Sequence, residues 1–404
     1  MGVRLKKLNK AKELSFLIMV VLFWFAQYVY IPFQTTYLTS FNITSNFVGA
    51  IIGAYGISQL VFRLPVGVLA DKIGIHKPFI IIGCFASGGA SLVRIFLPSG
   101  NGFLFGNLLS GFASAMWISF MVFYTQSFIK EEQQAATCRI VLFNNAGILI
   151  GFITSTLIYE LVGMRVICIL SFLSGMVAGI LGLQIKEEKT DFPRVPLKSL
   201  LKVCRGKRIL VFSLIALIQQ GIQLTTTMSF TSTILKELGA TSISVGVASI
   251  IYMISSVCFS GFASTKCCRK KGPNFWIPIV LISVTIYCIL VPRLSAIPLI
   301  LLLQILPGLS TGILFSYATS EAMKEVPQNK KSTAMGFYQA FYALGMTFFP
   351  ILTGEMVERY DMQTGYLMLA LIAVLGCILS IIYYILAGRF SMQDNRQKNC
   401  IPHE

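Results

Sequence analysis

Charged residues, histidine and tryptophan are scarce in this sequence. Only 12% of its 404 residues are charged, and it has two histidines and three tryptophans, whereas 55% of its residues are apolar. A soluble domain carries about twice that charged fraction. The composition therefore excludes a soluble enzyme and a disordered chain. A membrane-embedded enzyme would need clustered ionisable groups or a metal motif, and none is visible, so we expect no enzymatic activity.

Long apolar runs are what the chain has in abundance, and the mean hydropathy is +0.75. A helix that spans a bilayer needs about 20 mostly apolar residues. Twelve runs qualify, at 14–36, 45–69, 78–98, 102–128, 138–160, 163–185, 208–234, 243–264, 274–292, 295–320, 333–356 and 363–388. They lack the alternation of a membrane β-barrel. We therefore predict an all-α integral membrane protein with twelve transmembrane helices.

The net charge of +17 comes from one side of the predicted membrane. If the first run starts inside the cell, 28 of the 33 basic residues, Arg63 among them, fall on the cytoplasmic side, and five, Arg94 among them, fall on the other. This bias sets the orientation of membrane proteins. It predicts a multi-pass protein of the cell membrane with both termini cytoplasmic. A nucleic-acid partner is not expected, because the sequence has neither a folded basic domain nor a basic and aromatic stripe.

A polar, proline-broken segment divides the chain into two halves of six runs. We expect a cytoplasmic N-terminus at 1–13, a first bundle at 14–185, a linker at 186–207, a second bundle at 208–388 and a cytoplasmic tail at 389–404. The halves repeat at an offset of 194 residues, at which Gly67 matches Gly261 and Gly151 matches Gly345. Parallel repeats of six helices are a known plan for membrane transporters.

The loop after the second run carries the most specific pattern, Gly67-Val-Leu-Ala-Asp71-Lys72-Ile-Gly74-Ile-His-Lys77-Pro. Gly67 permits the close approach of a neighbouring helix, and Gly74 permits a tight turn. Asp71 places a carboxylate where it can face the partial positive charge of a helix N-terminus. A degraded copy begins at Gly261, with Thr265 in place of the aspartate.

This pattern resembles the signature inner loop of the major facilitator superfamily of secondary transporters. The resemblance implies two pseudo-symmetric six-helix bundles and transport by alternating access. It implies a gating role for the residues in and before the loop, namely Arg63, Gly67, Asp71, Lys72, Gly74 and Lys77. It also implies that Asp71 faces the N-terminus of the eleventh helix, near Lys331 and Ser332, when the inner side is closed.

The sequence departs in three places from the drug/proton antiporters of that superfamily. Ile75 stands where a basic residue is usual, and Asn107 stands where the fourth helix usually has arginine. The fifth helix lacks their Gly-Pro element. The departures weaken a specific claim of drug/proton antiport and leave the superfamily resemblance intact.

The resemblance places a substrate near mid-membrane, between the halves. Polar and aromatic side chains at helical spacing form faces on the helices concerned. An amide without a partner is costly in hydrocarbon, so these faces should point to the bundle interior or a wet cavity. The candidate substrate-binding residues are Gln27, Tyr30, Gln34, Trp117, Asn144, Gln220, Gln223, Gln304, Tyr338 and Tyr342. The alternative is that such residues hold helices together by mutual hydrogen bonds.

No carboxylate or histidine lies in the middle of an apolar run. We therefore expect a neutral pocket, which suits a neutral, zwitterionic or amphipathic solute. If transport is coupled to a proton or another ion, the candidate coupling groups are Glu160, Glu321 and Glu355, at the ends of runs. The alternative for each is a simple interfacial anchor. We expect no cofactor and no metal site.

These observations favour a monomeric secondary transporter whose partners are a small-molecule substrate and the lipid bilayer. Export is the favoured direction, because the aromatic and amide face of the first helix and the many phenylalanines suggest an adaptable pocket. Import or uniport of a nutrient or metabolite is the alternative. A lipid flippase or scramblase and a membrane receptor are alternatives of a different class.

Overall fold

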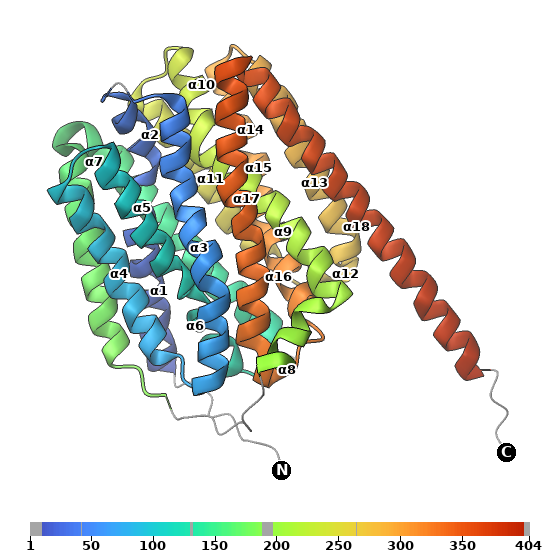
Figure 1. The fold of residues 1–404 in the computed structure, drawn as a ribbon. Helices are drawn as coiled ribbons and strands as arrows, with labels where there is room; N and C mark the ends of the chain where they lie inside the picture. The colour runs from blue at the N-terminus through green and yellow to red at the C-terminus, as the bar shows by residue number, and fades with distance from the viewer. Residues whose placement is uncertain (1–9, 42, 130–131, 188–196, 264, 400–404) are drawn as a thin grey trace.

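The computed structural model describes residues 10–41, 43–129, 132–187, 197–263 and 265–399, and this part of the chain is helical without strands. Long helices run roughly side by side as one bundle (Figure 1). The first half comprises α1 (Lys10–Tyr28), α2 (Ile31–Thr39), α3 (Ser45–Ile73), α4 (Lys77–Phe96), α5 (Gly100–Ala115), α6 (Trp117–Gln126) and α7 (Gln133–Leu183).

The second half has shorter elements because several of its helices are interrupted. They are α8 (Leu197–Lys202), η1 (Val203–Arg205), α9 (Lys207–Thr225), η2 (Thr226–Phe230), α10 (Thr231–Glu237), α11 (Ser242–Ala263), α12 (Lys266–Lys271), α13 (Pro273–Leu290) and η3 (Val291–Arg293). There follow α14 (Ile297–Leu303), α15 (Ile305–Leu309), η4 (Ser310–Leu314), α16 (Phe315–Met323), η5 (Gln328–Lys330), α17 (Lys331–Arg359) and α18 (Met362–Asn399).

The described residues contain twelve spanning segments, as predicted. Eleven helices are long and apolar enough to cross a membrane, and one of them, α7, supplies two segments because it consists of two helices joined at Gly163. Its chain reverses at Gly163, which has φ 71° and ψ 177° and so adopts backbone angles that other residues avoid. The boundaries agree with the apolar runs to within a few residues, because hydrocarbon thickness fixes the length of a spanning helix.

Two spanning segments contain a π-helical turn, η4 near the middle of its segment and η2 about two thirds of the way along its own. A π turn adds a residue to the helix and is frequently found at functional sites. The two turns place Thr227 and Thr311 next to the interior of the bundle, where both side chains are buried.

The two halves meet along two pairs of helices. α3 packs along α17, and α11 packs along the first part of α7. Glycines make the first contact close, since a Cβ added at Gly67 would lie 2.3 Å from the carbonyl oxygen of Ser332. In the second pair, Asn145 Nδ2 donates to Ser260 Oγ at 2.9 Å.

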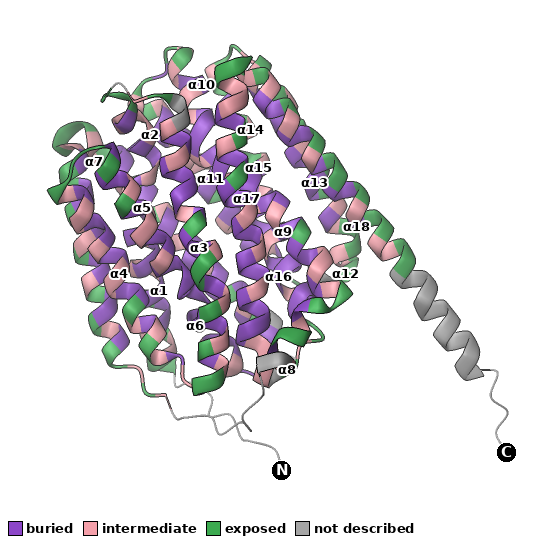
Figure 2. Ribbon diagram, in the orientation of Figure 1, coloured by how far each residue is buried: buried purple, intermediate pink, exposed green. Residues whose placement is uncertain are grey.

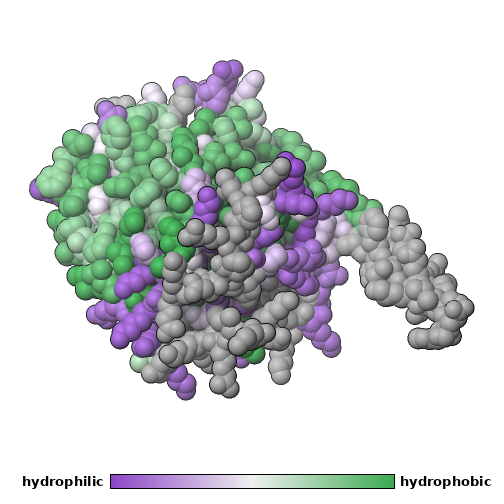
Figure 3. All heavy atoms as spheres, turned by 60° about the horizontal axis from the view of Figure 1, so that its bottom comes forward, coloured by the Kyte–Doolittle hydropathy of each residue, from purple (hydrophilic) through white to green (hydrophobic). Residues whose placement is uncertain are grey.

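Apolar side chains cover the sides of the bundle, as a membrane protein requires. Leu157, Leu161 and Leu375 are 70%, 83% and 63% exposed. Buried residues line the interior (Figure 2). Hydrophilic side chains gather at one end, seen in Figure 3. We call it the basic end; it is the end where α3 finishes and α17 begins, and it carries Lys72, Lys77, Lys324 and Lys331.

The terminal helices are longer than predicted. α1 already includes Lys10 to Glu13, which were assigned to the N-terminal tail, and α18 continues through 389–399. Glu13 is tolerated on the helix because it accepts a hydrogen bond from Tyr124 Oη at 2.7 Å and pairs with Arg139 at 2.6 Å. The predicted linker also contains α8 and η1.

Candidate binding and gating site

A central cavity of about 50 Å³ lies between the two halves. Helices from both halves line it with aromatic, amide and hydroxyl side chains. Its lining consists of Trp24, Tyr28, Tyr55, Gln59, Arg63, Trp117, Asn144, Asn145, Ile148, Gln220, Gln223, Tyr252, Met253, Thr311, Phe315, Tyr342 and Met346. Five of the ten predicted binding residues are among them: Trp117, Asn144, Gln220, Gln223 and Tyr342.

A second, smaller cavity of about 20 Å³ shares Tyr28 and Tyr55 with the first. It is lined by the predicted residues Gln27, Tyr30 and Gln34, together with Tyr28, Ile31, Ile52, Tyr55, Asn107 and Leu224. The predicted face of the first spanning segment therefore does line a cavity. Because pockets that hold small-molecule ligands measure about 300–1,000 Å³, neither cavity admits such a solute until the helices move.

A chain of hydrogen bonds joins three helices of the second half at the central cavity. Gln219 Nε2 donates to Gln223 Oε1 at 2.9 Å, and Gln223 Nε2 donates to Tyr252 Oη at 2.6 Å. Tyr252 Oη in turn lies 2.9 Å from Thr311 Oγ1. Tyr252 and Thr311 are not among the ten candidate binding residues; the signal for them in the sequence is a hydroxyl side chain within an apolar run.

Two predicted binding residues line neither central cavity. Gln304 Nε2 instead donates to Tyr287 Oη at 3.1 Å, and Tyr287 Oη lies 2.8 Å from Thr231 Oγ1. This is the alternative in which an amide holds helices together. Tyr338 is fully buried beside Tyr342, with its hydroxyl 3.1 Å from Thr319 Oγ1. Gln304 and Tyr338 therefore line neither of these two cavities in this structure.

The expectation of a neutral pocket was wrong. Arg63 lines the central cavity, is only 2% exposed and lies with its guanidinium carbon 4.4 Å from the centroid of the Tyr342 ring. It was counted as a basic residue of the cytoplasmic side. α3 continues to Ile73, so Arg63 lies about 15 Å inside the helix end at 1.5 Å per residue.

Arg94 is the second buried arginine, also 2% exposed, and was assigned to the outer side. Its Nη2 donates to Asn107 Oδ1 and Ser110 Oγ at 2.8 Å and to Tyr30 Oη at 2.9 Å. Asn107, at the position where antiporters usually have arginine, thus holds an arginine from α4. The signal that sequence reasoning missed was a charge within the predicted run 78–98.

The motif loop makes the contact that the resemblance implied for Asp71. Asp71 Oδ2 accepts hydrogen bonds from the backbone nitrogen and the hydroxyl of Thr333, both at 2.7 Å, and Oδ1 accepts from the nitrogen of Ser332 at 3.2 Å. Thr333 and Ser332 lie in the first turn of α17, where backbone N–H groups have no helical partner. The carboxylate therefore joins the two halves at the basic end.

The other motif residues shape the turn that follows. Gly74 ends α3 in the left-handed conformation, with φ 71°. Lys77 Nζ donates to the carbonyl of Leu183 at 2.9 Å, and Lys72 is exposed. Glu187, which was not predicted, accepts from the backbone nitrogens of His76 and Lys77 at 2.8 and 2.6 Å. Burial raises the pKa of the Glu187 carboxyl, although these hydrogen bonds oppose the rise.

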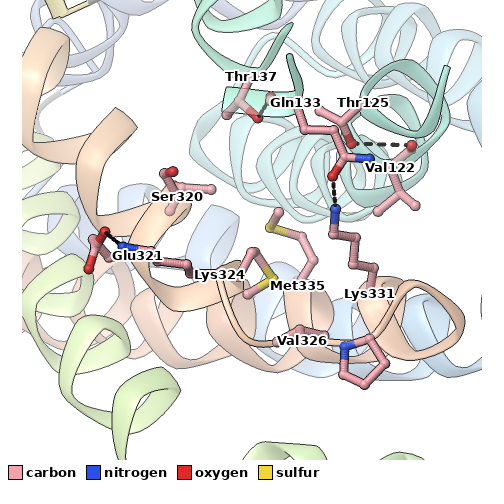
Figure 4. Close-up of a pocket in the computed structure, with 13 residues that line it drawn as sticks. Val122, Thr125, Gln133, Thr137, Ser320, Glu321, Lys324, Val326, Lys331 and Met335 are labelled. Carbon is pink, nitrogen blue, oxygen red and sulfur yellow. Dashed lines mark hydrogen bonds and ion pairs between the residues drawn. The ribbon is translucent and has the colours of Figure 1, made fainter. Parts of the chain in front are cut away.

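A larger cavity of about 360 Å³ lies at the basic end, between α6 and α7 on one side and α16 and α17 on the other (Figure 4). Lys331 Nζ crosses it to donate to Gln133 Oε1 at 2.5 Å. Thr319 lines this cavity and contacts Tyr338, which stacks edge-on against Tyr342 of the central cavity. These side chains therefore connect the linings of the two spaces.

The three candidate coupling carboxylates have different surroundings. Glu321 is 8% exposed, lines the cavity at the basic end and pairs with Arg208 and, at 3.6 Å, with Lys324. Glu355 pairs with Arg359 one turn away at the other end, and Glu160 is exposed. Only Glu321 of the three lies beside a space between the halves.

Comparison with known proteins finds relatives that are named as membrane transporters. The chain is 25% identical to the multi-drug resistance efflux pump PmrA of Streptococcus pneumoniae over 370 residues, which cover 88% of this chain and 91% of PmrA. It is 34% identical to the inner membrane transport protein YajR of Escherichia coli K12 over 85 residues, which cover 21% of this chain and only 18% of YajR.

The fold itself matches a solved transporter. The human organic anion transporter MFSD10 (TETRAN) superposes with a TM-score of 0.75 at 13% identity, over 92% of this chain and 100% of that one. The model of the Major Facilitator Superfamily matches residues 16–297 and 216–399, which together cover nearly all of the spanning helices. With twelve spanning segments in the described residues, a motif loop that contacts α17 and this match to the family model, the chain belongs to the Major Facilitator Superfamily.

Proposed function

We propose that the chain is a secondary active transporter that exports a small zwitterionic or amphipathic solute by alternating access. One observation carries the proposal: aromatic and amide side chains from both halves, among them Trp117, Gln220, Gln223 and Tyr342, face one cavity between them. Rings offer stacking area, and amides offer both a donor and an acceptor. Such a lining binds a solute that is part apolar and part polar.

The geometry at the basic end supports alternating access. The central cavity is too small for a solute, so one of the halves has to move before binding. Asp71 contacts α17 through hydrogen bonds to its carboxylate, and such contacts can break and form again at a cost of about 1.5–3 kcal/mol each. We assign Asp71, Gly67 and Gly74 to this gate.

Export is the direction that we propose, and the name of PmrA supports it, since that relative aligns with most of the chain. The charge bias of the sequence supports a cytoplasmic location of the basic end and of both termini, in the cell membrane. We propose a monomer and no cofactor. If the cycle is coupled to protons, Glu321 is the candidate, because it is buried beside the cavity at the basic end.

The experiment is solute counterflow in proteoliposomes with Nε-dansyl-lysine, a fluorescent zwitterion with an aromatic body. Vesicles loaded with non-radioactive Nε-dansyl-lysine should take up radiolabelled Nε-dansyl-lysine transiently and saturably. Linear uptake without counterflow would indicate a pore, and movement of labelled lipid instead would indicate a scramblase. Binding without any flux would indicate a receptor and would contradict the proposal.

Direction and coupling are tested in the same vesicles with an imposed pH gradient. Accumulation against the solute gradient, in the sense opposite to proton flow, supports proton-driven export, and accumulation in the same sense supports import. Glu321→Gln should abolish the effect of the gradient and leave counterflow in place. Glu160→Gln is the matched control, because Glu160 is exposed and away from the cavity.

A further inference from the structure

Arg63 places a positive charge in the wall of the central cavity. It lies on α3, is 2% exposed and belongs to the cavity lining together with Tyr342 and the two tryptophans Trp24 and Trp117. A buried charge is costly unless it is paired and hydrogen-bonded. The hydrogen-bond and charge partners of the Arg63 guanidinium therefore show whether the cavity still has room for an anionic group.

The guanidinium has few partners in the structure. Its Nη1 donates to the carbonyl oxygen of Gln339 at 3.1 Å, and the ring of Tyr342 lies against it, but Nε is buried without a hydrogen-bond partner. No carboxylate lines the cavity, and no ion pair among the described residues involves Arg63. An arginine has five N–H donors, so most of its capacity is unused.

The other buried arginine shows how the protein treats a charge that it only has to accommodate. Arg94 donates to Tyr30, Asn107 and Ser110 and lies 3.9 Å from the Tyr30 ring centroid. Three polar side chains thus accept hydrogen bonds from its Nη2, although its Nε, like that of Arg63, is buried without a hydrogen-bond partner. The contrast lies at the terminal nitrogens, where the Nη2 of Arg94 has three side-chain acceptors and the Nη1 of Arg63 has one backbone carbonyl.

We propose that Arg63 is the docking group for an acidic group of the transported solute, a carboxylate, sulfonate or phosphate. The inference rests on the proposed function and narrows its substrate class to amphipathic solutes that carry an acid. A planar guanidinium binds such groups with two parallel hydrogen bonds. The rings of Trp24, Trp117 and Tyr342 then face the apolar part of the solute, and Gln223 supplies a neutral hydrogen-bonding group.

The test uses two probes that differ only in the acid. Dansyl-alanine carries a carboxylate, and dansyl-alaninamide replaces it by a neutral amide. Two of the three tryptophans line the cavity, so binding is read as dansyl emission on tryptophan excitation in a Trp276→Phe background. We expect the acid to bind at least tenfold more tightly than the amide, since a hydrogen bond to a charged group accounts for about a 10- to 100-fold change in affinity. Equal binding of the two, or tighter binding of the amide, would overturn the proposal even without a variant.

Substitutions of Arg63 then test whether this residue causes the preference for the acid. Arg63→Gln should weaken binding of dansyl-alanine to that of the amide and leave amide binding unchanged, and Arg63→Lys should retain part of the preference as a single charge. Lys270→Gln removes one exposed charge outside the cavity and should keep the full preference. If Arg63→Gln also keeps the full preference in protein that elutes as folded, Arg63 serves only to join α3 to α17 and the proposal is wrong.

Failure of this inference differs from failure of the proposed function. If the amide and the acid bind and undergo counterflow equally, the proposed transport function is supported and the proposed acid preference is wrong. If the acid binds preferentially through Arg63 but no counterflow occurs, the proposed site is supported and the proposed transport function is wrong.

Discussion

Asp71 and Thr333 belong to different halves of the molecule, and one carboxylate oxygen of Asp71 accepts both the backbone N–H and the hydroxyl of Thr333 at 2.7 Å. The repeat does not reproduce this contact. Thr265, which stands at the matching place in the second half, accepts the backbone N–H of Cys268 at 3.3 Å within its own loop. Of the two matching positions, only Asp71 joins the halves at the basic end. A substitution of Asp71 alone should therefore reveal the effect of this contact.

Replacing Asp71 by asparagine should weaken the contact between the halves. The variant keeps the size of the side chain but removes the charge that faces the α17 N-terminus, an interaction of about 0.3–2 kcal/mol. The population with the basic end closed should fall by about 2- to 30-fold, and counterflow should slow. The distance between spin labels at 186 and 324 reports the change, in protein with Cys258, Cys267 and Cys400 replaced by serine.

The control for Asp71→Asn is Thr265→Ala, which removes a helix cap within one half at a cost of about 1 kcal/mol. It should lower stability slightly and leave the distance between the labels as in the parent protein. An unchanged distance and normal flux in Asp71→Asn would show that the contact does not govern the cycle.

Gly67 and Gly261 occupy the same place in the two halves but have different surroundings. A Cβ at Gly67 would meet the Ser332 carbonyl at 2.3 Å, whereas a Cβ at Gly261 would meet no atom within 4 Å. Gly67→Ala should therefore push α3 away from α17 and impair transport, and Gly261→Ala should leave it at the parent level. Flux in proteoliposomes compares the two, and equal effects of both would refute the close-packing explanation.

The sequence predicted those parts of the molecule that depend on local chemistry. The run at 78–98 becomes α4 over Lys77–Phe96, and the run at 333–356 becomes α17 over Lys331–Arg359. Hydrocarbon thickness sets the length that each helix needs to span the membrane, so its bounds depend little on the helices that pack beside it. The contact of Asp71 with the first turn of α17 was implied by the family resemblance; local chemistry alone predicted only that the carboxylate would suit a helix N-terminus.

The depth of a charged side chain could not be predicted in the same way. Arg63 and Arg94 lie within predicted runs but were assigned to the two surfaces, because counting basic residues by side treats each as a surface group. What keeps Arg94 inside the bundle is a set of partners on two other helices, Tyr30, Asn107 and Ser110. Sequence spacing on a single helix does not reveal them.

His76 gives the protein a dependence on pH outside its membrane segments. The residue is buried at the start of α4, and burial lowers its pKa from 6.5 to about 4. Between these values the unfolded chain binds a proton at His76 that the folded chain does not, so stability falls as the pH falls from 6.5 toward 4. The full difference is about 3 kcal/mol at 1.36 kcal/mol per pKa unit.

The comparison with His76→Gln isolates this effect. The nearby Glu187 has a raised pKa, so it takes up a proton earlier in the folded state and opposes the loss in both proteins. The Tm of the parent protein in detergent should therefore drop relative to that of the variant between pH 6.5 and 4 and stay parallel to it above pH 7. A constant difference across the range would show that His76 titrates normally.

The last prediction separates a binding glutamine from a structural one. Both Gln223 and Gln304 lie in the second half and hydrogen-bond to a buried tyrosine, Tyr252 in one case and Tyr287 in the other. They differ in that Gln223 lines the central cavity and Gln304 does not. Helical spacing predicted both as binding residues. The spacing places a side chain on one face of its helix but does not reveal which neighbouring helix or cavity that face meets.

Gln304→Leu should therefore lower stability by about 1–3 kcal/mol, since it leaves a buried hydroxyl with fewer partners, and should keep the apparent KM for dansyl-alanine. Gln223→Leu should raise that KM by up to about tenfold, the value of one hydrogen bond to an uncharged partner. Counterflow titrations give the KM, and thermal unfolding gives the stability of each variant. If Gln304→Leu raises the KM while the protein unfolds at the parent temperature, the binding site extends to Tyr287 and the division drawn between the two glutamines is wrong.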